Sequence, residues 1–415
     1  MTASRAEPVL RAPAASSVDA PVTVWSERAL AWTSRHTADL IAWRRDLHAH
    51  PELGFAEHRT TAGIVDRLRD FGLAPVVLPG GTGVVCDVGP ETALRTVCLR
   101  ADIDALPMAD AKDVAYRSQH EGLCHACGHD AHTAVLLGAA AVLAEAADEL
   151  PGRVRLVFQP AEEQTPGGAL SVVAAGVLDG VDQAYALHCD PRLAVGQVGL
   201  REGPITAAAD SVVVVVTGPG GHTSRPQLTA DVVYALGAVI TALPSLLSRR
   251  VDPRAGLSLV WGAVEAGRAG NAIPQRGELR GTLRVLDRTA WHAAEPLVRE
   301  LVAQVVAPTG CEVEVRYEHG VPPVVNTAAC VDRQREGAVA ALGADAVSTT
   351  AQSLGGEDFG WIAERVPSAL ARLGVMSAEV VSGDLHQPTF DLDERALAVG
   401  VRFSVATAVA ALAQP

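Results

Sequence analysis

One stretch indicates the fold class of this 415-residue chain: Val154-Arg155-Leu156-Val157-Phe158-Gln159-Pro160-Ala161-Glu162-Glu163. Its first half is apolar and predicts a buried β-strand, which Pro160 ends because proline cannot donate to a sheet ladder. The two glutamates then follow at the carboxyl end of the strand, where α/β proteins place their binding and catalytic groups. Adjacent side chains point in different directions, so one glutamate can bind a metal ion while the other faces a water molecule.

A second stretch is dense in metal-binding side chains: Cys124-His125-Ala126-Cys127-Gly128-His129-Asp130-Ala131-His132. Thiolate and imidazole are ligands of divalent ions such as Zn²⁺, so the first interpretation is a catalytic metal site. His188 ends a short apolar strand over residues 184–188, and His386 lies in a loop over residues 383–388. Each histidine alone is a weak signal, but with the two glutamates they form a plausible set of metal ligands.

Two other interpretations of the cysteine pair stay open. Cys124 and Cys127 could form a thioredoxin-like redox pair, although that motif normally opens a helix without histidines around it. They could also be half of a structural four-cysteine zinc site, which needs a second closely spaced pair. The remaining cysteines lie singly along the chain: Cys86, Cys98, Cys189, Cys311 and Cys330.

Strands and helices alternate around these stretches, as in an α/β domain. Strands are predicted over residues 83–88 and 95–101, followed by an apolar helix over about 132–150. This helix is expected to be buried, with its amino end beside the metal ligands. An earlier helix is predicted over residues 26–50, because Pro51 disfavours its continuation.

The order of elements changes between residues 206 and 320. The pattern there predicts strands over 211–217, 257–265, 278–286 and 312–317, with helices over 229–247 and 290–307. This βαββαβ order is that of a ferredoxin-like domain. The chain then returns to the first domain and closes with an apolar helix over 394–412.

We therefore predict an α/β protein of two domains. Residues 25–205 and 321–415 form the catalytic domain, and residues 206–320 form the inserted ferredoxin-like domain. Residues 1–24 are rich in Ala, Pro and Ser and lack the apolar segment of a signal peptide, so we expect a disordered extension.

The composition is that of an ordinary globular enzyme, with 48% hydrophobic and 20% charged residues. A net charge of −14 disfavours nucleic acid and anionic membranes as partners. Continuous apolar runs of membrane-spanning length are absent from the sequence, so no transmembrane segment is expected. Seven cysteines, an odd number, favour a reducing compartment and hence the cytoplasm.

Several motifs together resemble the M20 metallopeptidase and aminoacylase family, in particular the amidohydrolase branch that includes hippurate hydrolases and indoleacetyl-amino-acid hydrolases. The resemblance runs from about Trp43 to Ala411. The motifs occur in this order: Asp46-Leu47-His48-Ala49-His50-Pro51-Glu52, Leu99-Arg100-Ala101-Asp102-Ile103-Asp104-Ala105-Leu106-Pro107, Cys127-Gly128-His129-Asp130, Gln159-Pro160-Ala161-Glu162-Glu163, Gly218-Pro219-Gly220-Gly221-His222, Asn271-Ala272-Ile273-Pro274, Gly356-Glu357-Asp358-Phe359 and Leu385-His386-Gln387-Pro388. No single motif is decisive, but their joint order is highly specific.

The resemblance implies a pair of divalent ions in the catalytic domain and a lid or dimerisation role for the inserted domain. Cys127 matches the ligand that bridges the two ions. The other ligands match as follows: His129 and His188 for one ion, Glu163 and His386 for the other. Sulfur and imidazole suit Zn²⁺, Co²⁺, Ni²⁺ or Mn²⁺ better than Mg²⁺ or Ca²⁺.

The resemblance also implies roles for residues around the ions. Glu162 matches the general base that takes a proton from the attacking water, and Asp104 matches the carboxylate that orients a metal ligand. Asp102 occupies a position where more distant relatives carry a histidine ligand, and its role is left open. Cys124, His125 and His132 match no ligand and are interpreted as structural.

Three residues of the inserted domain complete the expected site. His222 matches a group that stabilises the oxyanion, and in dimeric relatives this histidine reaches the active site of the partner subunit. A homodimer is therefore expected. Asn271 matches a substrate contact, with a plain loop asparagine as the alternative. Arg284 matches a position that holds the substrate carboxylate in some relatives, with a surface arginine as the alternative.

These inferences predict a metal-dependent amidohydrolase that cleaves small N-acyl amino acids or similar conjugates. A dipeptidase and an N-acetyl-diaminopimelate-type deacetylase use the same mechanism and remain alternatives. A metal-binding protein without turnover is disfavoured by Glu162, because a structural metal site does not need an unligated carboxylate.

Overall fold

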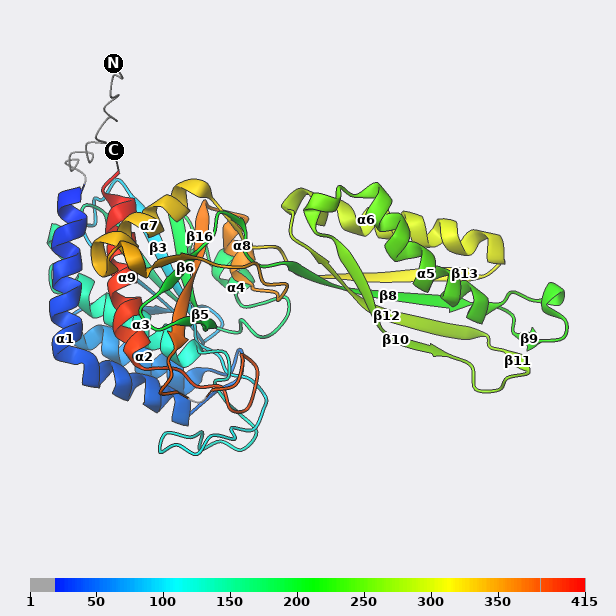
Figure 1. The fold of residues 1–415 in the computed structure, drawn as a ribbon, viewed down its shortest axis with the longest axis horizontal. Helices are drawn as coiled ribbons and strands as arrows, with labels where there is room; N and C mark the ends of the chain where they lie inside the picture. The colour runs from blue at the N-terminus through cyan, green and yellow to red at the C-terminus, as the bar shows by residue number, and fades with distance from the viewer. Residues whose placement is uncertain (1–18, 381, 415) are drawn as a thin grey trace, which may run out of the picture.

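The computed structural model describes residues 19–380 and 382–414 of the chain. Two bodies lie along the long axis of the molecule and are joined by a narrow connection (Figure 1). Segments from before and after residues 208–321 form the larger body, and these residues form the smaller one. The α/β class and the two-domain arrangement are those predicted.

The larger body contains an eight-stranded sheet of order β1-β2-β4-β3-β5-β16-β6-β15. Its central strands β4, β3, β5 and β16 are parallel, so that their carboxyl ends meet at one edge. The strands are β1 (Val76–Val77), β2 (Val84–Val88), β3 (Thr96–Asp102), β4 (Arg153–Gln159), β5 (Gln183–Ala194), β6 (Val198–Leu200), β15 (Val347–Thr349) and β16 (Ser368–Met376).

Helices cover both faces of this sheet. Side chains alternate across a strand, and on β3 Val97 and Leu99 belong to one hydrophobic core while Cys98 belongs to another. The first core includes α1 (Asp19–Ala49), α2 (His58–Asp70), α3 (His129–Ala144), α7 (Ala328–Leu342) and α9 (Arg395–Leu412). The second includes α4 (Ala169–Ala174) and α8 (Phe359–Ala363).

The smaller body has the predicted ferredoxin-like topology. Its antiparallel sheet has the order β10-β12-β8-β13, with two helices packed on one face (Figure 1). Its elements are β8 (Ala208–Thr217), α5 (Val232–Arg250), β10 (Ser258–Ala266), β12 (Arg276–Val285), α6 (Arg288–Val306) and β13 (Glu312–Val321). Two minor pairs complete the described strands: β9 (Gly221–His222) with β11 (Ala272–Ile273), and β7 (Gly203–Pro204) with β14 (Val325–Asn326).

The predicted extension over residues 1–24 is wrong for its last part, because α1 already begins at Asp19. Pro21 is tolerated in a first helical turn, where backbone N–H groups lack helical partners. Val22 and Trp25 are buried and tie this turn to the core of the larger body. Residues 1–18 lie outside the described part of the chain.

Helix α3 begins at His129, three residues before the predicted start, and ends at Ala144. Gly128 caps it in a left-handed conformation, with φ of 88°. A Cβ atom at this position would lie 2.9 Å from the Sγ atom of Cys189. Glycine therefore allows the chain to turn sharply from Cys127 into a fully buried helix.

Two helices, α5 and α9, are long and apolar enough to cross a membrane by length and composition alone. The apolar segment of α9 is 78% buried inside the larger body, as expected for a core helix. That of α5 is 33% buried, with one side against the four-stranded sheet. Both helices thus serve the packing of this protein.

Candidate metal centre

The expected metal ligands come together at the carboxyl edge of the central parallel strands. Glu162 and Glu163 follow β4, and His188 lies within β5. Cys127 and His129 lie at the start of α3. His386, in the loop after β16, reaches the same place because its backbone N–H donates to the carbonyl oxygen of Ala126 over 2.8 Å.

Two groups of ligand atoms share one sulfur. The side chains of Cys127, His129 and His188 place their donor atoms within 4.8 Å of one another, and so do those of Cys127, Glu163 and His386. The Sγ atom of Cys127 lies 3.5 Å from Nε2 of His188 and 3.3 Å from Nε2 of His386. Nε2 of His129 is buried without a hydrogen-bond partner. Oε1 of Glu163 lies 3.2 Å from Nε2 of His386. This cluster of closely spaced ligand atoms fits a pair of cations with Cys127 between them.

The second ring nitrogen of each buried histidine is held by a carbonyl group. Nδ1 of His129 donates to the backbone oxygen of Asp104 over 3.0 Å, and Nδ1 of His188 donates to that of Cys189 over 2.8 Å. Each ring therefore leaves its Nε2 free to face the centre, as a metal ligand requires. Burial and the charge of Arg372 hold the pKa of His188 well below its usual value, which keeps this ring neutral.

Asp104 organises the centre without facing the ligand atoms directly. Its two carboxylate oxygens accept hydrogen bonds from the backbone N–H groups of Glu162 and Glu163, each over 3.0 Å. One of them also lies 3.3 Å from Nδ1 of His129. One carboxylate thus fixes the position of both glutamates and one imidazole.

Asp102, whose role the sequence left open, lies beside the centre, with its Oδ1 atom 3.7 Å from Nε2 of His129. It accepts from Nδ1 of His132 over 2.6 Å and pairs with Arg100 over 2.7 Å. Nε2 of His132 accepts from the backbone N–H of Cys189 over 2.8 Å, so this ring joins α3 to β5. Both ring nitrogens of His132 therefore form hydrogen bonds within the protein, which indicates a structural role.

Glu162 lies beside the expected metal ligands but belongs to neither of the two groups that share the sulfur of Cys127. Its Oε2 lies 4.0 Å from Nε2 of His129, and its side chain is only 10% exposed. Burial and the nearby carboxylates of Glu357 and Glu163 raise the pKa of Glu162 well above its ordinary value. Such a group accepts a proton readily, as a general base must.

A pocket of 420 Å³ opens onto this centre. Arg284 reaches it from β12 of the smaller body and donates to the carbonyl oxygen of Leu354. The pocket thus draws on both bodies. The role of Arg284 in substrate binding stays a prediction.

His222 and Asn271 are not brought to the pocket of their own chain. His222 belongs to β9 and Asn271 precedes β11, and both strands lie at the end of the smaller body far from the larger one (Figure 1). Their expected contribution to the site therefore stays a prediction, and it requires the pocket of a partner subunit. His222 is exposed, and its Nδ1 accepts from the backbone N–H of Ser224 over 3.0 Å.

Two further residues line the pocket, and no role was predicted for them from the sequence: Glu357 and Arg372. Both are buried, at 3% and 6% exposure. The Gly-Glu-Asp-Phe motif marked Glu357, but without a role. Arg372 could have been noticed in the sequence because a charged residue stands there within an apolar strand. Its neighbours on β16, Ala371 and Leu373, are buried.

The family model described as "Peptidase family M20/M25/M40" matches residues 98–410. The chain belongs to this family. A crystal structure of the Bacillus subtilis YXEP protein, a dinuclear metal binding peptidase from the M20 family, matches 91% of this chain and 99% of its own, with a TM-score of 0.81 and 33% identity. The family, the fold and a centre for two divalent ions are thereby confirmed.

Among sequence relatives, the N-acetylcysteine deacetylase of Bacillus subtilis is 36% identical over 90% of this chain and 97% of its own length. A Rhodococcus jostii protein with the provisional name glutamate–cysteine ligase 2-3 is 51% identical over 91% of this chain. The present chain spans only 48% of that relative's length. This M20 chain is a metal-dependent amidohydrolase, as the motifs predicted.

Proposed function

We propose that this chain hydrolyses the amide bond of N-acyl amino acids that carry a small acyl group, releasing a carboxylic acid and an amino acid. The observation that carries the proposal is the shared sulfur of Cys127 between two ligand groups, with Glu162 beside them at a 420 Å³ pocket. A pocket of this size accommodates a small conjugate and excludes a folded protein.

Five residues would hold the ions, which we propose to be Zn²⁺, Mn²⁺, Co²⁺ or Ni²⁺: Cys127, His129, Glu163, His188 and His386. When bound, the two ions polarise the amide carbonyl and make water acidic enough to attack it near neutral pH. Glu162 then accepts the proton of the attacking water and returns it to the departing amine. Burial keeps Glu162 basic enough for both steps.

N-acetylcysteine is our first candidate substrate. Two Bacillus subtilis relatives are named for its deacetylation. A dipeptidase and an N-acetyl-diaminopimelate-type deacetylase remain the alternatives, since they differ only in the groups that the pocket receives.

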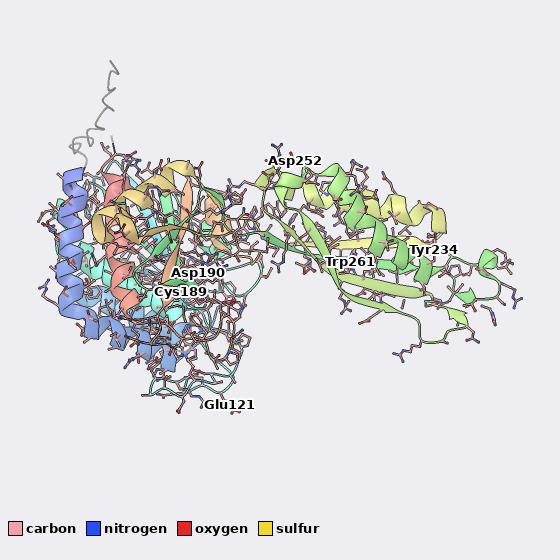
Figure 2. The ribbon with its side chains drawn as sticks, viewed as in Figure 1. Glu121, Cys189, Asp190, Tyr234, Asp252 and Trp261 are labelled. Carbon is pink, nitrogen blue, oxygen red and sulfur yellow. The ribbon has the colours of Figure 1, made fainter. Side chains whose placement is uncertain are left out.

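We also propose that the chain forms a homodimer through its smaller body, with His222 and Asn271 reaching the pocket of the partner subunit. Exposed apolar side chains on this body support an interface. They include Val260 and Val264 on the edge strand β10, and Tyr234 on α5 (Figure 2). Seven free cysteines support a cytoplasmic location, where thiols stay reduced.

The first experiment is to measure amine release from a panel of N-acyl amino acids and dipeptides. The protein is loaded with Zn²⁺, Co²⁺ or Mn²⁺ under reducing conditions. Turnover of N-acetyl amino acids that is lost with chelator and restored by added ion supports the proposal. Turnover of dipeptides alone favours the dipeptidase. Activity that survives chelator but is lost on thiol alkylation favours the redox interpretation of Cys124 and Cys127.

A further inference from the structure

Arg372 is a buried cation without an anionic partner. It lies on β16 and is 6% exposed. Its Nε is enclosed without an acceptor, and within residues 19–380 and 382–414 no hydrogen bond or ion pair engages its guanidinium. Burying a charge is costly unless the charge is paired, so an unpaired guanidinium requires a reason.

The other fully buried arginines of the larger body show how this protein normally treats such charges. Arg44 pairs with Asp130 over 2.7 Å and with Asp391 over 2.8 Å. Arg100 pairs with Asp102 and Asp358, each over 2.7 Å. Arg372 departs from this pattern.

Two carboxylates, Glu357 and Asp190, act electrostatically on Arg372, but both are already engaged elsewhere. Glu357 pairs with Arg100 over 3.2 Å and accepts from the backbone N–H of Phe359 over 2.9 Å. Asp190, on β5 of the larger body (Figure 2), pairs with Arg192 over 2.8 Å. An additional anion is therefore needed to neutralise the guanidinium.

Arg372 stands beside the metal centre. It is the register partner of His188 on the neighbouring parallel strand, and it lines the same pocket as His188 and Cys127. A carboxylate bound to Arg372 could therefore belong to a substrate whose amide carbonyl lies at the metal centre. Planar guanidinium binds carboxylate through two parallel hydrogen bonds.

We infer that Arg372 binds the α-carboxylate of the N-acyl amino acid and so makes a free carboxylate a condition for good substrates. This inference rests on the proposed function. It assigns to Arg372 the role that the motifs suggested for Arg284. Arg284 is only partly buried and donates to a backbone carbonyl, so its charge does not need a buried anion.

The test compares an N-acetyl amino acid with its C-terminal carboxamide on the ion-loaded protein. Arg372→Met keeps the length of the side chain and removes its charge. We expect kcat/KM for the carboxylate substrate to fall about 10²–10³-fold, chiefly through a higher KM. A loss of this size is typical when one partner of a buried charge pair is removed. The value for the carboxamide is expected to stay nearly constant. Arg372→Lys should recover part of the loss.

Two further variants separate this role from other effects. Arg335→Met, on the exposed surface of α7, makes the same change in net charge and should alter neither substrate's kinetics. If Arg284→Met shows the carboxylate-selective loss and Arg372→Met does not, the inference is wrong.

Arg372→Met should also leave the Tm of the protein equal or higher, because it removes an unpaired buried charge. A large decrease in Tm would indicate a structural role instead.

Binding distinguishes failure of this inference from failure of the proposed function. Calorimetry with Glu162→Gln protein measures the affinity for the carboxylate and the carboxamide without turnover. Absence of turnover on every N-acyl amino acid would contradict the proposed function. A preference for the carboxylate that disappears in the Glu162→Gln, Arg372→Met double variant would still support Arg372 as its binding group. Equal affinity for both compounds would overturn the inference.

Discussion

At the scale of single residues, the hydrogen bond on one ring nitrogen decides what the other nitrogen can do. His129 and His188 donate through Nδ1 to carbonyl groups and keep Nε2 for an ion. His132 uses both nitrogens within the protein. His125 is buried with neither nitrogen bonded, and burial lowers its pKa to about 4. Neighbours in sequence therefore have different chemistry.

Glu162→Gln tests the general base. The amide cannot accept a proton, so kcat should fall about 10²–10⁴-fold. The five ligands are unchanged, so we expect the metal content, measured by elemental analysis, to equal that of the wild type. Glu163→Gln is the matched control and should lower the metal content. A Glu162→Gln enzyme with the wild-type rate would remove Glu162 from this role.

His48 should make stability depend on pH. Burial disfavours its charge, but Asp130 and Asp110 outweigh this effect and raise the pKa of His48 to about 10. The unfolded value is about 6.5. Its contribution is therefore complete below about pH 6.5 and is lost as the pH rises toward 10.

The measurement is the free energy of unfolding in urea across this pH range. We expect a steeper decrease with rising pH for the wild type than for His48→Gln. The control His58→Gln, on the exposed surface, should follow the wild type. Identical slopes in all three proteins would contradict the charged state of His48.

At the scale of elements, the site depends on how strands end and helices begin. Four parallel strands bring their carboxyl ends together, and α3 starts there at His129, after its cap Gly128. The pattern of strands and helices was predictable because hydrophobic periodicity is local. The exact start of α3 was not, because Gly128 caps it through its own backbone conformation and its close approach to Cys189.

Gly128→Ala should destabilise the protein by about 1–3 kcal/mol, because an alanine at this positive φ is strained and its Cβ has no room. Urea unfolding measures the change. Gly237→Ala in α5 is the matched control, since a Cβ there meets no atom within 4 Å and helix propensity improves. Equal stability of Gly128→Ala and the wild type would show that the turn can relax.

At the scale of the whole molecule, the two bodies make one pocket but leave His222 far from it. Arg284 of the smaller body lines the pocket that opens on Cys127. The tip that carries β9 and β11 lies at the end of the smaller body far from the larger body (Figure 1). A second subunit is the simplest way to give that tip a function.

Mixed dimers test this arrangement. His222→Ala and Glu162→Gln subunits should each be nearly inactive alone, with a loss of roughly 10²–10³-fold for the missing oxyanion donor. If His222 acts on the partner's pocket, a statistical mixture regains about a quarter of the wild-type rate, because each mixed dimer has one complete site. Mixing that restores no activity would contradict the shared site.

The sequence by itself determined the family, the α/β class, the ferredoxin-like insertion and the residues that gather at the centre, because motifs and periodicity are local properties of the chain. Only the tertiary structure decided which nitrogen each histidine turns to an ion, that Asp102 is committed to His132 and Arg100, and that His222 lies away from its own pocket. It also revealed the unpaired charge of Arg372. These properties depend on contacts between distant segments, such as Cys127 with His386, 259 positions apart, and a linear pattern does not specify such contacts.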